Sequence, residues 1–390
     1  MNWPLMQNNI IHADKLALME FLAGEHIPRF TNGDQVRAFE AEFAAYIGTK
    51  YACMVNSGAS ANLVSMAAIA HIFGPGEVAV PVITWVSDIA AVMQAGLVPR
   101  FVDTDPFTLG MDWKDAVGPL TRAIFPTHVL GFNGLPELIP EIPMIEDCCE
   151  ALGAVTMEMG SGLEGVGPMR KLGSIGLASN FSFYYAHHMT TVEGGMICTN
   201  DRAFHETCRM LRGHGLLREC DDAEYRLRFE QSFPDLDPQF IFMMPGYNVR
   251  PTELQAVLGR AQLPRLDANV AARSANLRTF LGALDPAKYR TRYRLEGSSN
   301  YALPLILQEK HPILMGQVLG LLQAEGVEYR KGTAGGGNQL RQPYLRKLYG
   351  NLHERFPQAE HIHDYGLYIG NFPDLKAETI EALCQKLNAL

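Results

Sequence analysis

The sequence predicts an α/β protein, in which a large domain built on a mostly parallel, seven-stranded sheet precedes a smaller α+β domain. Three observations support this fold class. Of the 390 residues, 47% are hydrophobic and only 19% are charged, which is enough apolar side chain for a large buried core. Between about residues 35 and 200, short β-branched runs alternate with helical periodicity, as in sheets covered by helices. After Pro245 the pattern changes to a long helical segment.

The large domain is expected to contain seven strands. Each candidate is a short apolar run rich in β-branched residues, a composition that favours strands. Segments with helical periodicity lie between the runs, so helices should connect the strands and cover the sheet. The expected strands are residues 51–56, 78–81, 100–102, 123–127, 144–146, 179–184 and 195–199.

The rest of the chain is expected to form a smaller α+β domain joined through a long helix. Residues 252–281 have helical periodicity throughout. They are followed by strand-like, helical and again strand-like segments at residues 300–307, 313–325 and 327–330. We therefore place the large domain at residues 1–250 and the smaller domain at residues 251–390.

Charge and hydropathy exclude several classes of partner. The formal net charge of -9 at pH 7 disfavours nucleic acid, whose phosphates need clustered Lys and Arg. Residues 1–10 lack a basic stretch followed by an apolar one, so no secretory signal is expected. The longest apolar stretch, residues 63–97, is interrupted by glycine, proline and acidic residues, so no membrane-spanning helix is expected. These features predict a cytoplasmic protein.

No metal site or disulfide is expected. The seven cysteines are scattered among apolar residues without a CxxC pair, as is typical of reduced core thiols. His361 and His363 are two residues apart and share a face, yet no third ligand lies close to them in the sequence.

A turn of small residues at positions 56–62 follows an expected strand and precedes a helical segment. Free amides at a helix start, with glycine allowing close approach, form a natural phosphate cradle at Gly58 and Ala59. The alternative is an ordinary helix start capped by Ser57 or Ser60. The motif alone does not decide between the two.

Two further positions follow expected strands, where active-site groups of open α/β sheets collect. Trp85 offers an indole that could stack on a flat heterocycle, although core packing is the default for a single tryptophan. Asp147 ends an apolar strand, and its carboxylate could keep a ring nitrogen protonated. Taken by itself, Asp147 is more often a loop cap or a salt-bridge partner.

The segment 180–195 carries Ser182 and two neighbouring histidines, His187 and His188. Neighbouring side chains on an extended segment point to opposite sides, so the two histidines make a poor metal pair and one should face the pocket. We interpret the Glu-Gly-Gly triplet that starts at Glu193 as a structural turn rather than as a catalytic acid.

The four motifs, in this order and spacing, resemble the DegT/DnrJ/EryC1/StrS family of sugar aminotransferases over nearly the whole chain. The resemblance implies the type I fold of pyridoxal phosphate enzymes, with a large domain like that of aspartate aminotransferase. It includes residues 246–255, which in relatives come from the second subunit, and so implies a homodimer with shared active sites. Ordinary members keep a Schiff-base lysine between a Ser-Phe pair and an acidic-Gly-Gly triplet. Here that position is His187, and the nearest lysine is Lys171.

A histidine cannot form a stable imine with an aldehyde, so the cofactor must be held by contacts. Its imidazole, with an ordinary pKa near ~6.5, suits proton transfer at neutral pH. Within the family, this replacement resembles the 3-dehydratases of nucleotide-linked 4-keto-6-deoxy sugars, with GDP-4-keto-6-deoxymannose as the expected substrate. The resemblance implies removal of the C3 hydroxyl, as in the biosynthesis of colitose for lipopolysaccharide. It makes His187 the catalytic acid and base, L-glutamate the amino donor, and pyridoxal phosphate and pyridoxamine phosphate the cofactor forms.

The resemblance also implies the remaining site residues. Those expected near the sugar nucleotide or the amino donor are Thr31, Arg218 and Arg330, and guanidinium groups suit bidentate binding of phosphate or carboxylate. Those expected to hold the cofactor are Gly58, Ala59, Trp85, Asp147, Ser182 and Asn248 of the partner subunit.

One histidine-bearing branch of the family carries a two-iron cluster on four cysteines that follow the segment equivalent to residues 212–218. Only Cys220 is available there, so no iron–sulfur cluster is expected. Two alternatives stay open, namely an aminotransferase that aminates the 4-keto sugar and an inactive member that serves as a binding subunit. The glycine-rich loop at residues 332–337 does not resemble the dehydratases closely, and it leaves the sugar and the nucleotide open.

Overall fold

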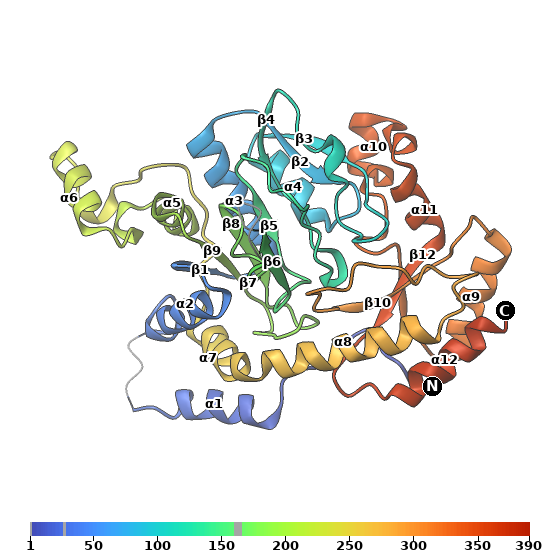
Figure 1. Ribbon diagram of the computed structural model, residues 1–390. Helices are drawn as coiled ribbons and strands as arrows, with labels where there is room; N and C mark the ends of the chain where they lie inside the picture. The colour runs from blue at the N-terminus through green and yellow to red at the C-terminus, as the bar shows by residue number, and fades with distance from the viewer. Residues whose placement is uncertain (1, 26–28, 160–165) are drawn as a thin grey trace.

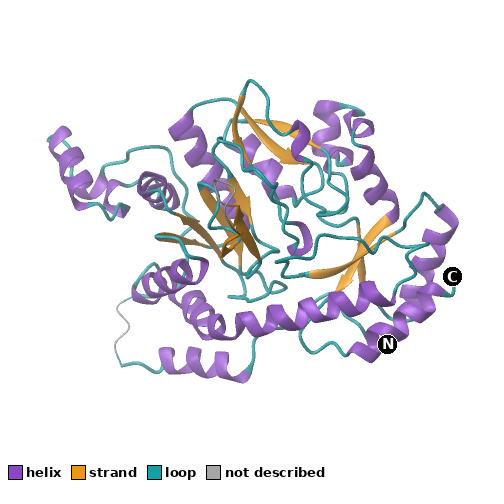
Figure 2. Ribbon diagram, in the orientation of Figure 1, coloured by secondary structure: helices purple, strands orange, loops and turns teal. Residues whose placement is uncertain are grey.

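The computed structural model describes residues 2–25, 29–159 and 166–390. Strands occupy the middle of the molecule with helices around them, and a second group of strands lies beside the C-terminal helices (Figures 1 and 2). This is the predicted α/β arrangement with a smaller α+β part.

A strand is present at each of the seven expected places. Their bounds differ from the expected ones by a few residues at most, and one difference has a clear cause. The fourth strand ends before Pro126, which has no N–H to donate to a neighbouring strand. The strands are β1 (Tyr51–Val55), β2 (Glu77–Pro81), β3 (Val98–Val102), β4 (Thr121–Ile124), β5 (Ile145–Asp147), β8 (Ala178–Ser182) and β9 (Gly195–Thr199).

The hydrogen-bonded order of these strands is β1-β9-β8-β5 in one group and β3-β2-β4 in the other. Parallel bridges from Ile124 to Met144 and from Thr127 to Asp147 place the chain at the end of β4 beside β5. Neighbours are parallel except β9, which is antiparallel to both β1 and β8. The carboxyl ends of β1, β5 and β8 therefore lie at the same edge of their sheet, which is where parallel strands present loop residues to a ligand.

Twelve α-helices lie within the described residues, and none of them is both long and apolar enough to cross a bilayer. The strands β6 (Val155–Met159) and β7 (Val166–Lys171) pair with each other in antiparallel orientation. The helices are α1 (His12–Leu22), α2 (Asp34–Ile47), α3 (Gly58–Phe73), α4 (Val86–Gln94), α5 (Arg202–Arg212), α6 (Ala223–Ser232), α7 (Glu253–Gln262), α8 (Leu266–Ala283), α9 (Pro312–Ala324), α10 (Pro343–Tyr349), α11 (Pro357–Tyr365) and α12 (Ala377–Asn388).

The long helix expected at residues 252–281 is two helices rather than one. A 3₁₀ turn, Leu263–Arg265, separates α7 from α8. Pro264 lies in this turn, and a proline inside a helix removes one hydrogen bond and clashes with the preceding turn. The second helix, α8, then runs along one side of the molecule towards α12 (Figure 1).

The C-terminal part contains an antiparallel sheet in the order β10 (Ala302–Ile306), β12 (Gly366–Gly370) and β11 (Tyr329–Lys331). The strands β10 and β11 match expected segments, whereas β12 was not predicted. Its five residues are all buried between the other two strands.

One hydrophobic core joins the two parts of the chain. Val82, Ile83 and Phe132, from loops that follow the large-domain strands, pack in the same cluster as Leu303 and Ile369 of the C-terminal sheet. The C-terminal sheet is therefore held against the loops that follow β2 and β4. The domain boundary at residue 250 remains a prediction.

Candidate active site

A cavity opens at the sheet edge where the parallel strands end. Its volume is about 220 Å³, many times the ~10–15 Å³ that one water requires, so it admits a small organic molecule. Residues from several strand ends and from the C-terminal part line it together. Seven of the predicted site residues are among them, namely Gly58, Ala59, Trp85, Asp147, Ser182, His187 and Arg330.

The start of α3 forms one wall of the cavity. Ser57 caps the helix by accepting a hydrogen bond from the Ser60 backbone N–H at 3.1 Å. A Cβ atom at Gly58 would lie 2.6 Å from the Cβ atom of Ser182, so only glycine lets β8 come this close. The turn is thus both a capped helix start and a cavity wall. Its free amides and the Ser182 hydroxyl suit an anionic group such as a phosphate.

We expect Gly58→Ala to weaken the binding of a phosphate-bearing ligand by about tenfold or more, a loss of ~1.4 kcal/mol or more in binding free energy. The added methyl group must push the helix start away from Ser182. An absorbance titration with pyridoxal phosphate measures the change. Gly282→Ala in α8 is the matched control, because nothing lies within 4 Å of its added Cβ atom. Equal affinity in wild type and Gly58→Ala would contradict the cradle.

Asp147 lies at the end of β5 and is 3% exposed. One carboxylate oxygen accepts the Cys149 backbone N–H at 2.9 Å, and the other accepts the Asn62 side-chain amide at 3.0 Å. Asp147 therefore caps a loop, as the alternative interpretation held, and also lines the cavity. Both carboxylate oxygens of Asp147 therefore accept a hydrogen bond from an N–H donor.

Trp85 lies at the N-terminus of α4 and is 49% exposed. This exposure excludes core packing, which was the default interpretation of the residue. Its indole contributes a flat apolar surface to the cavity, and such a surface suits stacking on an aromatic ring.

His187 lines the cavity, whereas its neighbour His188 is buried outside the lining and lies 3.1 Å from the Ser299 carbonyl oxygen. The His187 ring packs against Tyr301, with 5.3 Å between ring centroids, and its Nδ1 is buried without a hydrogen-bond partner among the described residues. Burial lowers the pKa of His187 to about 4, and Arg273 lowers it further against the opposing effect of Asp147. The imidazole is therefore neutral at pH 7 and can accept a proton.

We expect His187→Gln to reduce the loss of stability in mild acid. The folded-state pKa of His187, about 4, lies below the unfolded value of ~6.5. Its contribution to stability is therefore complete above pH ~6.5 and is lost as the pH falls towards 4. Urea unfolding of the ligand-free proteins should show that wild type loses about 1–3 kcal/mol more than the variant over this range. Parallel pH curves for the two proteins would refute a buried, neutral His187.

Comparison with known proteins identifies the family to which this chain is related. The family model described as "DegT/DnrJ/EryC1/StrS aminotransferase family" matches residues 12–388. The chain belongs to this family. The resemblance expected from the motifs is thereby confirmed.

Characterised family members are similar over most of the chain. A GDP-4-keto-6-deoxy-D-mannose 3-dehydratase of Yersinia pseudotuberculosis is 31% identical over 370 residues, 91% of each protein. The enzyme of the same name from Escherichia coli O55:H7 is 30% identical over 386 residues, 95% of each. A crystal structure of GDP-4-keto-6-deoxymannose-3-dehydratase with a trapped PLP-glutamate geminal diamine has a TM-score of 0.83 and 29% identity, over 99% of this chain and all of the other. The predicted fold of a pyridoxal phosphate-dependent sugar aminotransferase is confirmed.

Several cavity residues of this DegT/DnrJ/EryC1/StrS family member were not predicted. Glu150 lies three residues after Asp147, so the acidic run around that strand end was a usable signal. Tyr301 and Tyr368 come from the C-terminal part and belong to no local motif. The full set comprises Ser57, Ser87, Thr127, Cys149, Glu150, Tyr184, Glu193, Tyr301, Ala334 and Tyr368.

Two of these residues refine earlier interpretations. Cys149 was expected to be a core thiol, but it is partly exposed and lines the cavity because it follows the strand end that carries Asp147. Glu193 does belong to a turn, in which its carbonyl oxygen accepts hydrogen bonds from Thr191 and Gln255. It also lines the cavity.

Glu150 brings a second proton-carrying group to the cavity. One of its carboxyl oxygens accepts the Leu130 backbone N–H at 2.7 Å. Burial raises the pKa of Glu150 to about 8, and nearby Asp147 acts in the same direction, while the Leu130 amide and Arg330 oppose the shift. The cavity wall therefore holds a carboxyl group that carries a proton near neutral pH.

Thr31 and Arg218 do not join the other predicted residues within one chain. They line a separate cavity that is rich in arginine and acidic side chains. Asn248 is among the lining residues of neither cavity, and its Oδ1 accepts a hydrogen bond from Arg250 at 3.3 Å. The sequence grouped Thr31 and Arg218 with Arg330, but the fold places them beside α2 and the segment after α5, away from the strand ends.

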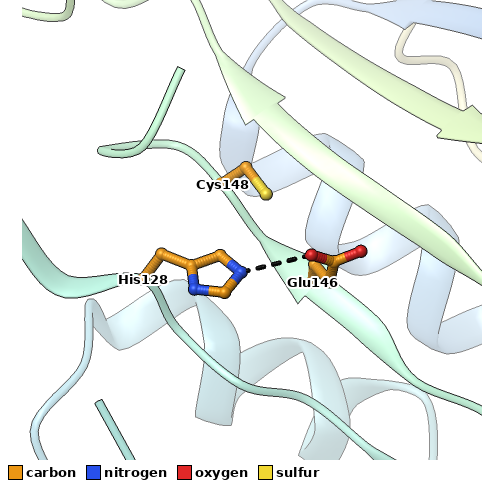
Figure 3. A group of neighbouring side chains, drawn as sticks. All are labelled: His128, Glu146 and Cys148. Carbon is orange, nitrogen blue, oxygen red and sulfur yellow. Dashed lines mark hydrogen bonds and ion pairs between the residues drawn. The ribbon is translucent and has the colours of Figure 1, made fainter. Parts of the chain in front are cut away.

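Within the described residues, one group of side chains could in principle hold a metal ion: His128, Glu146 and Cys148 (Figure 3). The His128 Nδ1 accepts the Gly134 N–H at 3.1 Å, so in the neutral ring Nε2 carries the proton and donates to Glu146 at 3.3 Å.

Backbone N–H groups occupy the remaining hydrogen-bonding positions of the Glu146 carboxylate. Its carboxylate also accepts backbone N–H groups of Gly173, Ile175 and Gly176, and burial raises the pKa of the Cys148 thiol. Because the carboxylate is fully hydrogen-bonded and the thiol stays protonated, we interpret the group as structural.

Proposed function

We propose that the protein is a pyridoxal phosphate-dependent 3-dehydratase that removes the C3 hydroxyl of GDP-4-keto-6-deoxymannose, with L-glutamate as amino donor. The observation that carries this proposal is His187 in the cavity. Among the described residues that line the cavity, none is a lysine. A neutral imidazole at this place can move protons but cannot bond covalently to an aldehyde cofactor.

The cavity fits pyridoxal phosphate. The close approach of α3 to Ser182, which requires glycine at position 58, leaves free amides and a hydroxyl for the phosphate. Asp147 offers a carboxylate for the ring nitrogen, and Trp85 offers a surface for the ring. When bound, the cofactor supplies an electron sink and an amine carrier. Relatives for which PLP is named have the same fold.

His187 is the residue we assign to proton transfer. With the cofactor bound, its unpaired nitrogen would accept a proton. The same group then donates that proton to the departing C3 hydroxyl of the sugar, so one residue serves as base and acid. Tyr301, whose ring packs against the imidazole at an interplanar angle of 30°, holds the imidazole in place. Glu150, which carries a proton near neutral pH, is a second proton donor at the same cavity wall.

The substrate side of the site is assigned to arginines. Arg330 lines the cavity and is exposed, so its guanidinium can bind a carboxylate or phosphate at the mouth. Thr31 and Arg218 line the second cavity, whose arginines also suit a diphosphate. We assign them to the sugar nucleotide or to glutamate at the active site of a partner subunit, which Asn248 of the same chain also reaches.

A homodimer is part of the proposal. The segment around α6 stands away from the rest of the molecule (Figure 1). It carries large apolar side chains that are 41–59% exposed, a pattern that marks interaction surfaces: Leu227, Phe233, Leu236, Phe240 and Phe242. A second copy of the chain that covers this surface would bring its own cavity to the arginines beside the segment.

The decisive experiment is product analysis. The purified protein is incubated with GDP-4-keto-6-deoxymannose, pyridoxal phosphate and L-glutamate, and ammonia, 2-oxoglutarate and the nucleotide-sugar mass are measured. A 3-deoxy-4-keto sugar with equal amounts of ammonia and 2-oxoglutarate is expected. An amino sugar formed without ammonia would establish an aminotransferase instead, and no reaction or spectral change would favour an inactive binding subunit. CDP-, UDP- and dTDP-linked analogues test the nucleotide in the same assay.

A further inference from the structure

A second buried carboxyl group lies beneath the cavity, next to Asp147. Asp88 belongs to the first turn of α4 and is fully buried. The side-chain amide of Asn62 donates to both carboxyl groups, at 2.6 Å to Asp88 and 3.0 Å to Asp147. No residue of the cavity chemistry described so far explains why a carboxyl group is buried here.

The hydroxyls around Asp88 indicate its protonation state. One Asp88 oxygen is hydrogen-bonded to Thr84 and, at 2.7 Å, to Thr127, while the two threonine hydroxyls lie 2.7 Å from each other. The three oxygen atoms thus form a closed triangle of contacts. Each contact requires one hydrogen, and the two hydroxyls supply only two. The third hydrogen is available if Asp88 is a carboxylic acid.

Charge leads to the same conclusion. In the part of the chain that the structure describes, none of the groups hydrogen-bonded to Asp88 or Asp147 is a Lys, Arg or His side chain. Two ionised carboxylates cannot be buried side by side without a cation, so one of the pair must keep a proton. Asp147 accepts two N–H donors and needs no proton of its own.

We propose that Asp88 is a positioning residue that stays a carboxylic acid in the folded protein, so that Asp147 alone carries the negative charge of the pair. The protonation of Asp88 stands independently of the proposed function. Its consequence, that a full charge on Asp147 faces the ring nitrogen of the cofactor, rests on that function. If Asp88 were the ionised member, Asp147 would hold the proton and could not stabilise a protonated ring nitrogen.

The surroundings of Asp88 favour the acid form. Burial, followed by the nearby charge and hydrogen bond of Asp147, raises the pKa of Asp88 well above its ordinary value, against the opposing hydrogen bonds of Thr84 and Thr127. Cys149 and Tyr344 also interact with Asp88 electrostatically, and neither is a cation.

The test is infrared spectroscopy of the ligand-free protein with ¹³C-labelled aspartate, which separates Asp88 from the protonated Glu150. We expect one labelled carboxylic-acid carbonyl band at pH 7. Asp88→Asn should remove this band, whereas Asp147→Asn should remove a carboxylate band. The asparagine amide at position 88 can supply the third hydrogen of the triangle, so this variant should fold. Loss of the acid band in Asp147→Asn and of a carboxylate band in Asp88→Asn would reverse the assignment and overturn the proposal.

A measurement on the wild type alone keeps the proposal testable if a variant does not fold. Absence of any labelled acid band at pH 7 would overturn the proposal.

With a folded Asp88→Asn variant, urea unfolding adds a second readout. A raised folded-state pKa adds stability that is complete below the unfolded value of ~3.9 and is lost as the pH rises. The stability of wild type should therefore decline from pH 4 to 7 relative to the variant, and equal slopes would count against the acid form. None of these readouts depends on pyridoxal phosphate or the sugar.

Discussion

His187→Asn should lower the rate of sugar deoxygenation by about 10²–10⁴-fold, the range that positioned general acids and bases contribute. Asparagine can occupy the space beside Tyr301, but it cannot take up and return a proton at neutral pH. Glutamate-dependent ammonia release from GDP-4-keto-6-deoxymannose measures the change. The binding of pyridoxal phosphate should change little by comparison, because the proposed phosphate contacts lie at Gly58 and Ser182.

His188→Asn is the matched control for this prediction. It removes an imidazole from the adjacent position, where the side chain is buried outside the cavity lining and contacts the Ser299 carbonyl oxygen. It should lower the free energy of unfolding by roughly 1–3 kcal/mol through the lost buried hydrogen bond and leave most of the turnover of the folded enzyme. A wild-type rate in His187→Asn would remove this residue from the mechanism.

His187→Lys sharpens the same prediction. The introduced amine should bond covalently to the aldehyde of the cofactor, and borohydride should then fix the cofactor to the protein. Deoxygenation should be lost, because the amine is consumed by the bond and no neutral imidazole remains. Mass spectrometry after reduction measures the covalent link. If deoxygenation persisted at the original rate, the assigned role of His187 would be wrong.

Asp147→Asn should reduce turnover by about 10²–10³-fold, as is typical when a preorganised charge at a reacting group is removed. An amide cannot keep the ring nitrogen protonated, so the cofactor becomes a weaker electron sink. Both carboxylate oxygens of Asp147 accept hydrogen bonds in the wild type. In the variant, the amide nitrogen that replaces one of these oxygens therefore faces an N–H donor. Turnover and the absorbance of bound pyridoxal phosphate are measured together.

Glu146→Gln provides the control for Asp147→Asn. Glu146 precedes Asp147 on the same strand, and its carboxylate accepts hydrogen bonds from His128 and from backbone N–H groups near Gly173. It is not among the residues that line the cavity. The variant should lose stability but keep the cofactor spectrum of wild type. A similar spectral change in both variants would argue that Asp147 acts through folding rather than through the ring nitrogen.

Much of the fold was predictable because its signals are local. The β-branched runs predicted all seven strands of the large part, and the small-residue turn at 56–62 predicted a helix start capped by Ser57 or Ser60, where α3 begins at Gly58. Errors arose where one residue changed the outcome. Pro126 ended β4 early and Pro264 divided the expected helix, although both prolines were visible in the sequence. The strand β12 begins and ends with glycine, a residue depleted in strands, so its local signal was weak.

The candidate site was only partly predictable. Gly58, Trp85, Asp147 and Ser182 could be grouped because each follows or ends a strand and parallel strands end at one edge. Tyr301 and Tyr368 could not be grouped with them, since their approach depends on the packing of the C-terminal sheet against the large-domain loops. For the same reason, Thr31 and Arg218 were placed with Arg330 although the chain holds them in another cavity.

The sequence by itself determined the family resemblance, the order of the strands along the chain and the prediction that His187 replaces a lysine, because each rests on residues close together in the sequence. The tertiary structure decided which side chains share the cavity and which of them hold protons. A neutral His187, a protonated Glu150 and the buried pair of Asp88 and Asp147 all follow from burial and from neighbours distant in the sequence. Desolvation by burial shifts the pKa of a group, and so do nearby charges. Neither effect can be predicted from a residue and its neighbours along the chain.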